Sequence, residues 1–548
     1  MIRKVTIRGF KRFDEVEFDL PGHIVLAGPN NCGKTTVLQA LAAWGLALSQ
    51  WRELYDTRKH KGAYAKKPLT RQVFYSVPLR SFELLWRDRR YANPIVIEVE
   101  HRDGWRIGME FIPDSTEQVY VRPTKETEVG PLKDARIDVA YVPPMSGPGT
   151  EEPVYQKPKI EQLLGLGRPG ELVRNLLVQA NESGERWRRL QESVERMFGY
   201  ELLPPDSSVA DIVAEYREAP GKQPLDIASA GSGFQQVLML MTFLYTRPAS
   251  ILLLDEPDAH LHIILQDAIY DELRMVANIE KSQLILATHS EVVINAVAAR
   301  EVCVLVRQPR MLASDEEKST LIASLTMLSN ADIMQAEIAP GILYLEGHTD
   351  LSLLREWARV LGHPVSGFLT TRLFWKPTTW PSKGRLPGVR AKDHYDALGL
   401  VTEELPALQI VDGDAGQGVQ PTEITGAGFQ RCRWNRYEIE SYLLHPAALE
   451  RYVRQTVGED VAKTHVDAMM EYLRENFPPR FLTDPFGDHG LLDTAKARTT
   501  LLPGILDAAG LPGIPYTRYH EIAAVMEPDE IHPEVKEKLD LIQKAFNL

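Results

Sequence analysis

The chain has 548 residues, of which 44% are hydrophobic and 25% are charged, as is ordinary for a soluble globular protein. Its 62 basic and 75 acidic residues give a net charge of −13, which argues against polyanion binding by the whole surface but not against a local basic groove. We expect no membrane span, signal peptide or zinc site, because there is no apolar run of about 18 residues and the three cysteines form no CxxC pair. A reducing, cytoplasmic location is predicted.

The first motif lies at 24–41, where IVLAGPNNCGKTTVLQAL reads as an apolar strand, a glycine-rich loop and a helix. The loop fits G-x-x-x-x-G-K-[ST], in which backbone N–H groups cradle phosphates, the lysine neutralises charge and the hydroxyl ligates Mg²⁺. The sequence therefore predicts an ATP and Mg²⁺ site formed by Gly28, Asn30, Asn31, Gly33, Lys34, Thr35 and Thr36.

The partners of this loop are expected far along the chain. SILLLDEPDAHLH (250–262) is an apolar strand ending in Asp255, which would hold the Mg²⁺ shell, and Glu256, which would orient or deprotonate the attacking water. SQLILATHS (282–290) is a second buried strand that ends near His289, one crossover helix later. A lone histidine is usually structural, but this position favours a sensor of the γ-phosphate.

The segment between Lys34 and Asp255 is too long for one crossover and must hold inserted subdomains. Residues 95–122 alternate around a DG turn, which predicts antiparallel hairpins. Residues 157–218 are charged and helical in period, and ASAGSGFQQVLMLMTFL (228–244) predicts a Gly/Ser loop that opens an apolar helix.

These parts resemble the ABC-type ATPases of the SMC and OLD-like branch over roughly residues 1–310. The resemblance implies that GSGFQQ is the signature loop, that Ser232 and Gly233 contact ATP across a homodimer, and that ATP is sandwiched between two copies. The chain departs from the family in two places. The signature is not LSGGQ, and the strand AYVPPM (140–145) lacks the glutamine often found at its end.

A second set of carboxylates follows apolar strands downstream. Glu346 and Asp350 lie in ILYLEGHTDLSLL, and Asp412 and Asp414 lie in LQIVDGDAG. In an open α/β sheet the carboxyl ends of strands converge on one crevice, and clustered carboxylates require cations such as Mg²⁺ or Mn²⁺. Each piece has a simpler interpretation, since Asp350 could cap a helix and DGD is commonly a turn.

Glu438 and Glu440 form an E-x-E pair further on, with exposed strand residues as the alternative. Together the acidic motifs resemble a Toprim domain, and the whole chain, over perhaps 1–450, resembles the OLD (overcoming lysogenisation defect) family of ATP-dependent endonucleases. The resemblance implies that these six carboxylates bind metal, that Glu346, Asp412 and Asp414 are catalytic, and that a downstream base, for which Lys496 is a candidate, stabilises charge. It also implies bacterial anti-phage defence beside a helicase or effector protein.

Two basic stretches are candidates for nucleic-acid contact. TTRLFWKPTTWPSKGRLPGVRAKDH (370–394) interleaves basic residues with aromatic ones, and TRKHKGAYAKKPLTR (57–71) is basic. A solvated loop with tryptophans in the core is an equally weighted alternative for the first, and a disordered loop for the second. DNA is favoured over RNA, which stays open.

The fold class is therefore predicted as α/β: an ABC/SMC-type P-loop ATPase domain (1–310, helical insertion 150–225), a connector (311–340), a Toprim-like domain (341–450) and a helical C-terminal region (451–548). The expected function is an ATP-regulated, metal-dependent nuclease. One alternative is an ATPase sensor or scaffold whose second half binds a partner without cutting. Another is a topoisomerase-type enzyme, for which Tyr437 and Tyr442 are present.

Overall fold

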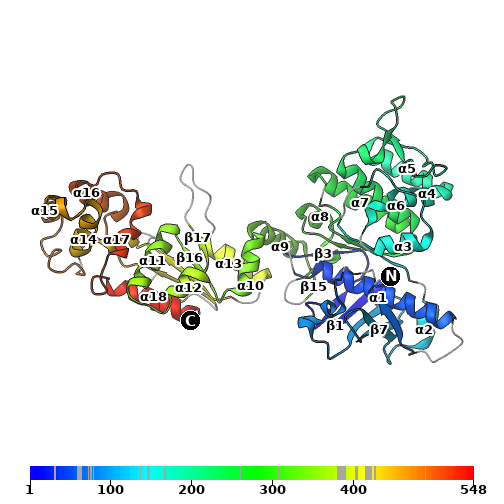
Figure 1. Cartoon of the computed structure of the whole chain (residues 1–548), viewed down its shortest axis with the longest axis horizontal. Coiled ribbons are helices and arrows are strands. Elements are labelled where there is room, and N and C mark those ends of the chain that lie inside the picture. The colour runs from blue at the N-terminus through cyan, green and yellow to red at the C-terminus, as the bar shows by residue number, and fades with distance from the viewer. Residues whose placement is uncertain are drawn as a thin grey trace. The chain divides into compact units, whose positions relative to one another are not determined.

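The computed structural model divides into two compact units, residues 1–326 and 327–548, shown in blue to green and in green to red in Figure 1. It describes all residues except 30–31, 58–63, 72, 75–76, 78, 136, 145–147, 166–167, 260, 306–308, 379–389, 402–404, 414–422, 425–427 and 488. The boundary falls inside the segment expected as a connector, which contains two helices, α9 (Asp315–Met327) and α10 (Asn330–Ile338).

The first unit is built around a six-stranded, mostly parallel sheet. Its strands, in spatial order, are β15 (Arg310–Met311), β14 (Val302–Val304), β3 (Ile24–Ala27), β13 (Gln283–Ala287), β12 (Ile251–Asp255) and β8 (Val139–Val142). The central strands are buried at every position and almost wholly apolar, because both faces of the sheet are covered. Successive residues alternate between two cores, with Val25 and Leu252 on one side and Leu26 and Leu253 on the other.

Helices and a second sheet cover these two faces. The helices of the unit are α1 (Lys34–Thr57), α2 (Val129–Asp134), α3 (Lys157–Gly165), α4 (Val173–Glu182), α5 (Gly184–Phe198), α6 (Ser232–Thr246), α7 (Ile263–Ile279) and α8 (Glu291–Ala296). The second sheet is antiparallel, in the order β2 (Glu15–Asp19), β1 (Ile2–Arg8), β5 (Ile95–His101), β6 (Arg106–Pro113), β7 (Gln118–Pro123) and β4 (Lys67–Thr70). Helix α1 packs between the two sheets, and α4 to α7 pack on the opposite face of the parallel sheet (Figure 1).

The inserted segment is not purely helical. After α5 the chain forms a small antiparallel sheet of β11 (Leu225–Asp226), β10 (Glu215–Arg217) and β9 (Glu201–Leu202). These strands are two or three residues long, too short for a period of two to show in the sequence. They lead directly into the loop before α6.

The second unit holds a five-stranded sheet in the order β17 (Phe374–Pro377), β16 (Ile342–Leu345), β18 (Ala407–Val411), β20 (Phe429–Arg433) and β19 (Glu423–Ile424). The first four are parallel, and β19 is antiparallel to β20. Helices of this unit besides α10 are α11 (His348–Val360), α12 (Ser366–Thr371), α13 (Ala391–Val401), α14 (Pro446–Val457), α15 (Glu459–Asn476), α16 (Leu502–Ala508), α17 (His520–Ala524) and α18 (Pro533–Ala545).

The C-terminal helices share one core with this sheet. Leu343 and Leu408 of the sheet belong to the same buried cluster as Leu473, Leu502 and Leu539 of the C-terminal helices. The sheet face therefore depends for its burial on helices that lie much later in the chain.

Candidate functional site

The phosphate-binding loop has the backbone that its glycines require. Gly28 and Gly33 have φ values of 149° and 109°, and a Cβ at either would lie 2.8 Å from a neighbouring atom, Leu305 O or the Phe13 ring. Side chains are therefore excluded, and the backbone can approach a ligand closely. The Lys34 ammonium donates to the carbonyls of Gly28 and Pro29 at 2.7 and 2.8 Å.

Thr35 and Thr36 lie in the first turn of α1, which the loop opens. Asn30 and Asn31, also predicted to bind nucleotide, lie outside the described residues.

Asp255 is buried at the carboxyl end of β12, with 4% of its surface exposed. The Thr35 hydroxyl donates to its Oδ1 at 3.1 Å, and the Tyr141 phenol donates to its Oδ2 at 3.0 Å. Burial raises the pKa of Asp255, although both hydroxyl groups oppose the shift. The carboxylate and the Thr35 hydroxyl predicted to share a Mg²⁺ ion are thus in contact.

Glu256 stands in a left-handed backbone conformation with φ of 47°, which is uncommon for a residue other than glycine. Its N–H donates to the Ala287 carbonyl at 2.9 Å, and its Oε1 lies 3.2 Å from Nδ1 of the half-exposed His289. Strained backbone of this kind is commonly stored where a side chain must be aimed. The structure therefore brings Glu256 and His289 together beside Asp255.

The loop before α6 is held by buried side chains. Ser232 lies exposed in the first turn of α6, and Gly233 follows it half-buried. Arg174, 1% exposed, donates to both oxygens of Asp226 at 2.8 and 2.9 Å, and Gln235 Nε2 donates to three carbonyls of the loop. The loop is thus held by several side-chain hydrogen bonds, although its tip is exposed.

The first carboxylates of the second unit meet across neighbouring strands. Strand β16 pairs in parallel with β18, so Glu346 and Asp412, which follow these strands, come to the same edge of the sheet. The Asp412 N–H donates to Glu346 Oε1 at 3.1 Å. The glycine between Asp412 and Asp414 has no room for a side chain, because a Cβ at Gly413 would lie 2.2 Å from the Arg436 carbonyl.

Asp350 does cap α11, the simpler role considered for it. Its Oδ2 accepts the N–H groups of Glu346 and Gly347 at 3.1 and 3.3 Å, and Thr349 Oγ1 donates to Oδ1. Burial and the nearby charges of Glu440 and Glu346 nevertheless raise its pKa to about 7. Burial and the charges of Glu346, Asp350 and Glu440 also raise the pKa of Asp412 well above its usual range. The carboxylates therefore form one electrostatically coupled cluster.

Glu438 and Glu440 are not exposed strand residues, which rules out that alternative. Glu440 is fully buried in the short 3-10 helix η6 (Ile439–Leu443), and Glu438 is 8% exposed just before it. Arg498 binds both glutamates. Its side-chain Nε donates to Glu440 Oε1 at 2.6 Å, and its backbone N–H donates to Glu438 Oε2 at 2.8 Å. The Arg498 Nη2 also lies 3.9 Å from Asp412 Oδ2.

Arg498 was not predicted from the sequence, where the candidate was Lys496, two residues earlier. Lys496 is exposed, and its charge lowers the pKa of Glu438 against the larger effect of burial. Arg498 lies in the π-helix η7 (Ala497–Leu501). Such helices are enriched at functional sites, but no sequence pattern predicts this one.

A divalent cation fits the chemistry of these ligands, because hard oxygen donors that raise one another's pKa gain from added positive charge. Within the described residues, however, no three His, Cys, Asp or Glu side chains are arranged to hold a metal ion. Asp414 lies outside those residues. Glu346 and Asp412 are the pair best placed as ligands, and Mg²⁺ is commonly held by one or two carboxylates together with substrate phosphates.

Tyr442 does not have the environment of a nucleophile. It is buried, donates to Glu534 and accepts the Arg436 N–H at 3.1 Å. Burial and the Glu534 charge raise its pKa above the usual range, which disfavours the phenolate. This counts against the topoisomerase-type alternative at Tyr442.

The basic segment 370–394 is only partly described, since 379–389 lie outside the described residues. Lys376 forms an ion pair with the buried Asp332 at 2.5 Å, and Lys392 pairs with Asp396 at 2.8 Å. Phe374 is buried and Trp375 packs on the core. These side chains thus have structural partners. In the other basic stretch (57–71), residues 58–63 also lie outside the described part of the chain.

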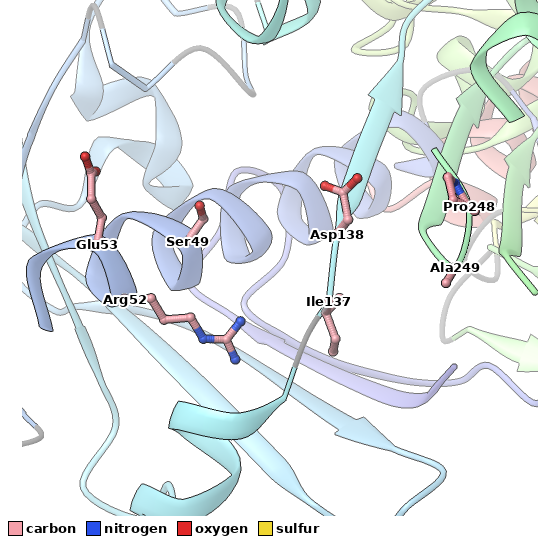
Figure 2. A pocket seen from close by; sticks show the side chains of 7 residues that line it. All are labelled: Ser49, Arg52, Glu53, Ile137, Asp138, Pro248 and Ala249. Carbon is pink, nitrogen blue, oxygen red and sulfur yellow. The ribbon is translucent and has the colours of Figure 1, made fainter. Parts of the chain in front are cut away.

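A pocket of about 520 Å³ lies away from the nucleotide site (Figure 2). Ser49, Arg52 and Glu53, near the end of α1, line it together with Ile137, Asp138, Pro248 and Ala249. The last four residues stand at the amino ends of β8 and β12, whereas Asp255 stands at the carboxyl end of β12. Helix α1 separates the two places by roughly 27 Å, at 1.5 Å per residue.

Comparisons with known proteins support the presence of a nucleotide site in the first unit. A family described as "AAA domain, putative AbiEii toxin, Type IV TA system" matches residues 155–295, and one described as "AAA ATPase domain" matches residues 1–43. No curated protein matches the chain significantly.

Solved structures with partial similarity include an SMC head bound to the C-terminal winged-helix domain of ScpA (15% identity, 58% of this chain, 99% of that chain, TM-score 0.36). Others are an SMC head with an extended coiled coil bound to the C-terminal domain of ScpA from Pyrococcus furiosus (14%, 59%, 99%, 0.35) and the SMC head of Thermotoga maritima (16%, 55%, 94%, 0.29).

The matched families and the geometry of Lys34, Thr35 and Asp255 define the class of the first unit. It is a nucleotide-binding ATPase domain in a mixed α/β fold, and the families it is similar to are described as AAA domains. Among the described residues, no helix is both long and apolar enough to cross a membrane.

Proposed function

We propose that the chain is an ATP-regulated, divalent-metal-dependent nuclease of the OLD type that cleaves nucleic-acid phosphodiesters, DNA in preference to RNA. The observation that carries the proposal is the contact between the ends of two parallel strands, where the Asp412 N–H donates to Glu346 Oε1 at 3.1 Å. Around this contact, burial together with the charges of Glu346, Asp350 and Glu440 raises the pKa of Asp412. A cluster of this kind gains from a cation and from the phosphate that a cation brings.

The residues of the ATP site have separate roles. Lys34 and the glycine loop bind the phosphates, and Thr35 with Asp255 would hold the Mg²⁺ ion that accompanies ATP. Glu256, oriented by His289, accepts a hydrogen bond from the attacking water and turns it toward the γ-phosphate. Ser232 and Gly233 reach a nucleotide held by a second copy, because they are at the exposed start of α6.

At the second site, Glu346 and Asp412 are the residues that would hold the metal, with Asp414 beside them in sequence. When bound, a divalent ion supplies electrophilic stabilisation of the phosphoryl group and a more acidic water. Asp350 fixes the backbone of Glu346, and Arg498 holds Glu440 and Glu438 in place. Lys496 stays a candidate for stabilising negative charge.

The proposed cellular role is anti-phage defence, with a homodimer formed through the ATPase units and a helicase or effector protein as partner. The AbiEii description of the matched family supports a role of this general kind, because it names a toxin of a toxin–antitoxin system.

A second function is favoured by one observation. Asp350 is committed to backbone N–H groups and Glu440 to Arg498, so both resemble structural carboxylates. On this alternative the chain is an ATPase sensor or scaffold, and its second unit binds a partner effector without cutting.

The test is cleavage of supercoiled plasmid, single-stranded DNA and single-stranded RNA by the full chain, with Mg²⁺ or Mn²⁺, with and without ATP. Asp412→Asn removes the charge at the proposed site, and Lys34→Ala removes ATP binding. Asp467→Asn is the matched control, because Asp467 is exposed on α15.

Cutting that is lost in Asp412→Asn and kept in Asp467→Asn supports the nuclease. The Lys34→Ala lanes then show whether ATP activates or restrains it. ATP hydrolysis without cutting of any substrate, under either metal, contradicts the nuclease and favours the scaffold.

A further inference from the structure

Tyr141 contacts Asp255 from the edge of the parallel sheet. Strand β8 pairs in parallel with β12, with Tyr141 opposite Leu253, and both residues point to the α1 face. Asp255 is two residues beyond Leu253, so its side chain points to the same face. The Tyr141 phenol reaches along the sheet and donates to Asp255 Oδ2 at 3.0 Å.

Asp255 is thereby held on both oxygens. Thr35 Oγ1 donates to Oδ1 at 3.1 Å, from the opposite side of the carboxylate. The terminal torsion of an aspartate is broad, so a single hydrogen bond leaves the plane of the carboxylate free to turn. Two donors on different oxygens fix that plane.

Two further polar side chains stand close to this contact. Gln39 on α1, 8% exposed, acts on the Tyr141 phenol as a nearby donor does and lowers its pKa. The Lys11 ammonium donates to Gln39 Oε1 at 2.5 Å. Because Oε1 of Gln39 accepts from Lys11, the amide nitrogen is the part of Gln39 that is left to face the phenol.

Burial agrees with this direction. The Lys11 side chain is desolvated enough to lower its pKa to about 8, so its contact with Gln39 stands in surroundings of low polarity. Burial and the Asp255 charge raise the pKa of Tyr141 above its usual range, so the phenol keeps its proton and remains a donor.

We propose that Tyr141 is a positioning residue of the ATP site, which fixes the Asp255 carboxylate for the nucleotide-bound divalent cation, with Gln39 and Lys11 orienting its hydroxyl group. The inference rests on the ATP-site half of the proposed function.

The test compares the Mg²⁺ dependence of nucleotide binding in Tyr141→Phe and the wild-type chain. Binding of a fluorescent ADP is titrated at fixed protein with EDTA alone and over a range of Mg²⁺ concentrations. The half-saturating Mg²⁺ concentration is expected to rise about tenfold in Tyr141→Phe, the size of one hydrogen bond to a charged group. ADP binding in EDTA is expected to match the wild type.

Tyr245→Phe is the matched control, because its phenol is also buried but bonds Ser193, away from the site. It is expected to leave the Mg²⁺ dependence unchanged. Gln39→Leu keeps the phenol and removes its orienting partner, and it should shift the half-saturating concentration in the same direction by a smaller factor. This second variant carries the test if Tyr141→Phe lowers the melting temperature more than Tyr245→Phe does.

An unchanged Mg²⁺ dependence in both Tyr141→Phe and Gln39→Leu overturns the inference and leaves Tyr141 as a packing residue. A wild-type chain that does not bind ADP, with or without Mg²⁺, overturns the proposed ATP site itself. The two failures are distinct, because the second appears without any substitution.

Discussion

The two carboxylate sites of the molecule differ in what balances their negative charge. In the first unit, Asp255 receives two hydroxyl groups and Glu256 faces His289, so each acid has its own donor. In the second unit, burial together with the charges of Glu346 and Glu440 raises the pKa of both Asp350 and Asp412. The first site is satisfied by its own residues, whereas the second depends on Arg498, bound protons or an added cation.

The largest effect is expected from a substitution in the first site that removes a charge and leaves the fold intact. Glu256→Gln keeps the size of the side chain but removes the charge that would turn or deprotonate water. ATP turnover is expected to fall by a factor of about 100 or more, because a positioned acid or base contributes 10²–10⁴-fold.

Steady-state phosphate release checks this result, and ATP binding measured separately should stay near the wild-type value. Turnover within threefold of the wild type would remove Glu256 from the reaction. Glu291→Gln, on the exposed start of α8, is a suitable control.

The next effect breaks the charge balance of the second site. Arg498→Ala leaves the fully buried Glu440 without its guanidinium partner, and removal of one member of a buried pair costs about 3–5 kcal/mol. The free energy of unfolding of the second unit should fall by this amount, as followed by urea denaturation.

Arg498→Lys is the informative companion, because one ammonium cannot reproduce the contacts of Nε and Nη2 with Glu440. It should lie between the wild type and Arg498→Ala. A change below about 1 kcal/mol in Arg498→Ala would mean that Glu440 is satisfied by other groups.

A third effect concerns pH. Because the pKa of Asp350 is raised to about 7 in the folded chain, the folded state binds a proton that the unfolded state releases near its ordinary value of 3.8. Stability from this group is therefore fully present below about pH 4 and is lost as pH rises to about 7. The loss is roughly 2–4 kcal/mol at most, because a tenfold difference in proton affinity corresponds to about 1.4 kcal/mol.

Asp350→Asn keeps an oxygen that can accept the Glu346 and Gly347 N–H groups but removes the titration. In EDTA, the variant should be more stable than the wild type at pH 8 and should lose the slope between pH 4 and 7. Wild-type and variant chains with parallel stability profiles would show that Asp350 does not titrate in this window.

The sequence predicted the residues that lie in short motifs and missed those that reach them from a distance. Short local motifs that follow apolar strands identify Lys34, Thr35 and Asp255. The structure brings Thr35 and Asp255 into contact. Tyr141 lies on an edge strand and Arg498 in a π-helix, with no local signal. Their roles arise from long-range packing, which no period or motif records.

The fold divides in the same way. Apolar runs such as ILLL and ILYL predicted the buried strands of both parallel sheets, because strands covered on both faces lack polar positions. The strands β9 to β11 were not predicted, since two or three residues cannot display alternation. The position of Glu346 beside Asp412 could be predicted from the ends of the strands alone, whereas the burial of Glu440 could not be predicted.

The smallest effect sharpens the comparison inside the second unit, where another buried aspartate shows the opposite behaviour. Burial would raise the pKa of Asp332, but hydrogen bonds from His394, Lys376 and Ser329 hold it well below the usual range. Its stabilisation is therefore present above about pH 4 and is lost as pH falls, the reverse of Asp350. Asp332→Asn should destabilise the unit by about 1–3 kcal/mol at pH 7, and by less at pH 3.

Lys376→Met is the matched variant, because it removes the partner from β17 and leaves the buried acid of α10 in place. It should destabilise the unit at pH 7 and raise the pH at which acid unfolding begins. Urea denaturation at pH 3, 5 and 7 distinguishes the contributions of the two aspartates to the free energy of unfolding. These contributions should change with pH in opposite directions, because Asp332 has hydrogen-bond donors around it and Asp350 has other carboxylates. A change in the same direction would mean that burial alone, rather than the neighbouring charges, governs both pKa values.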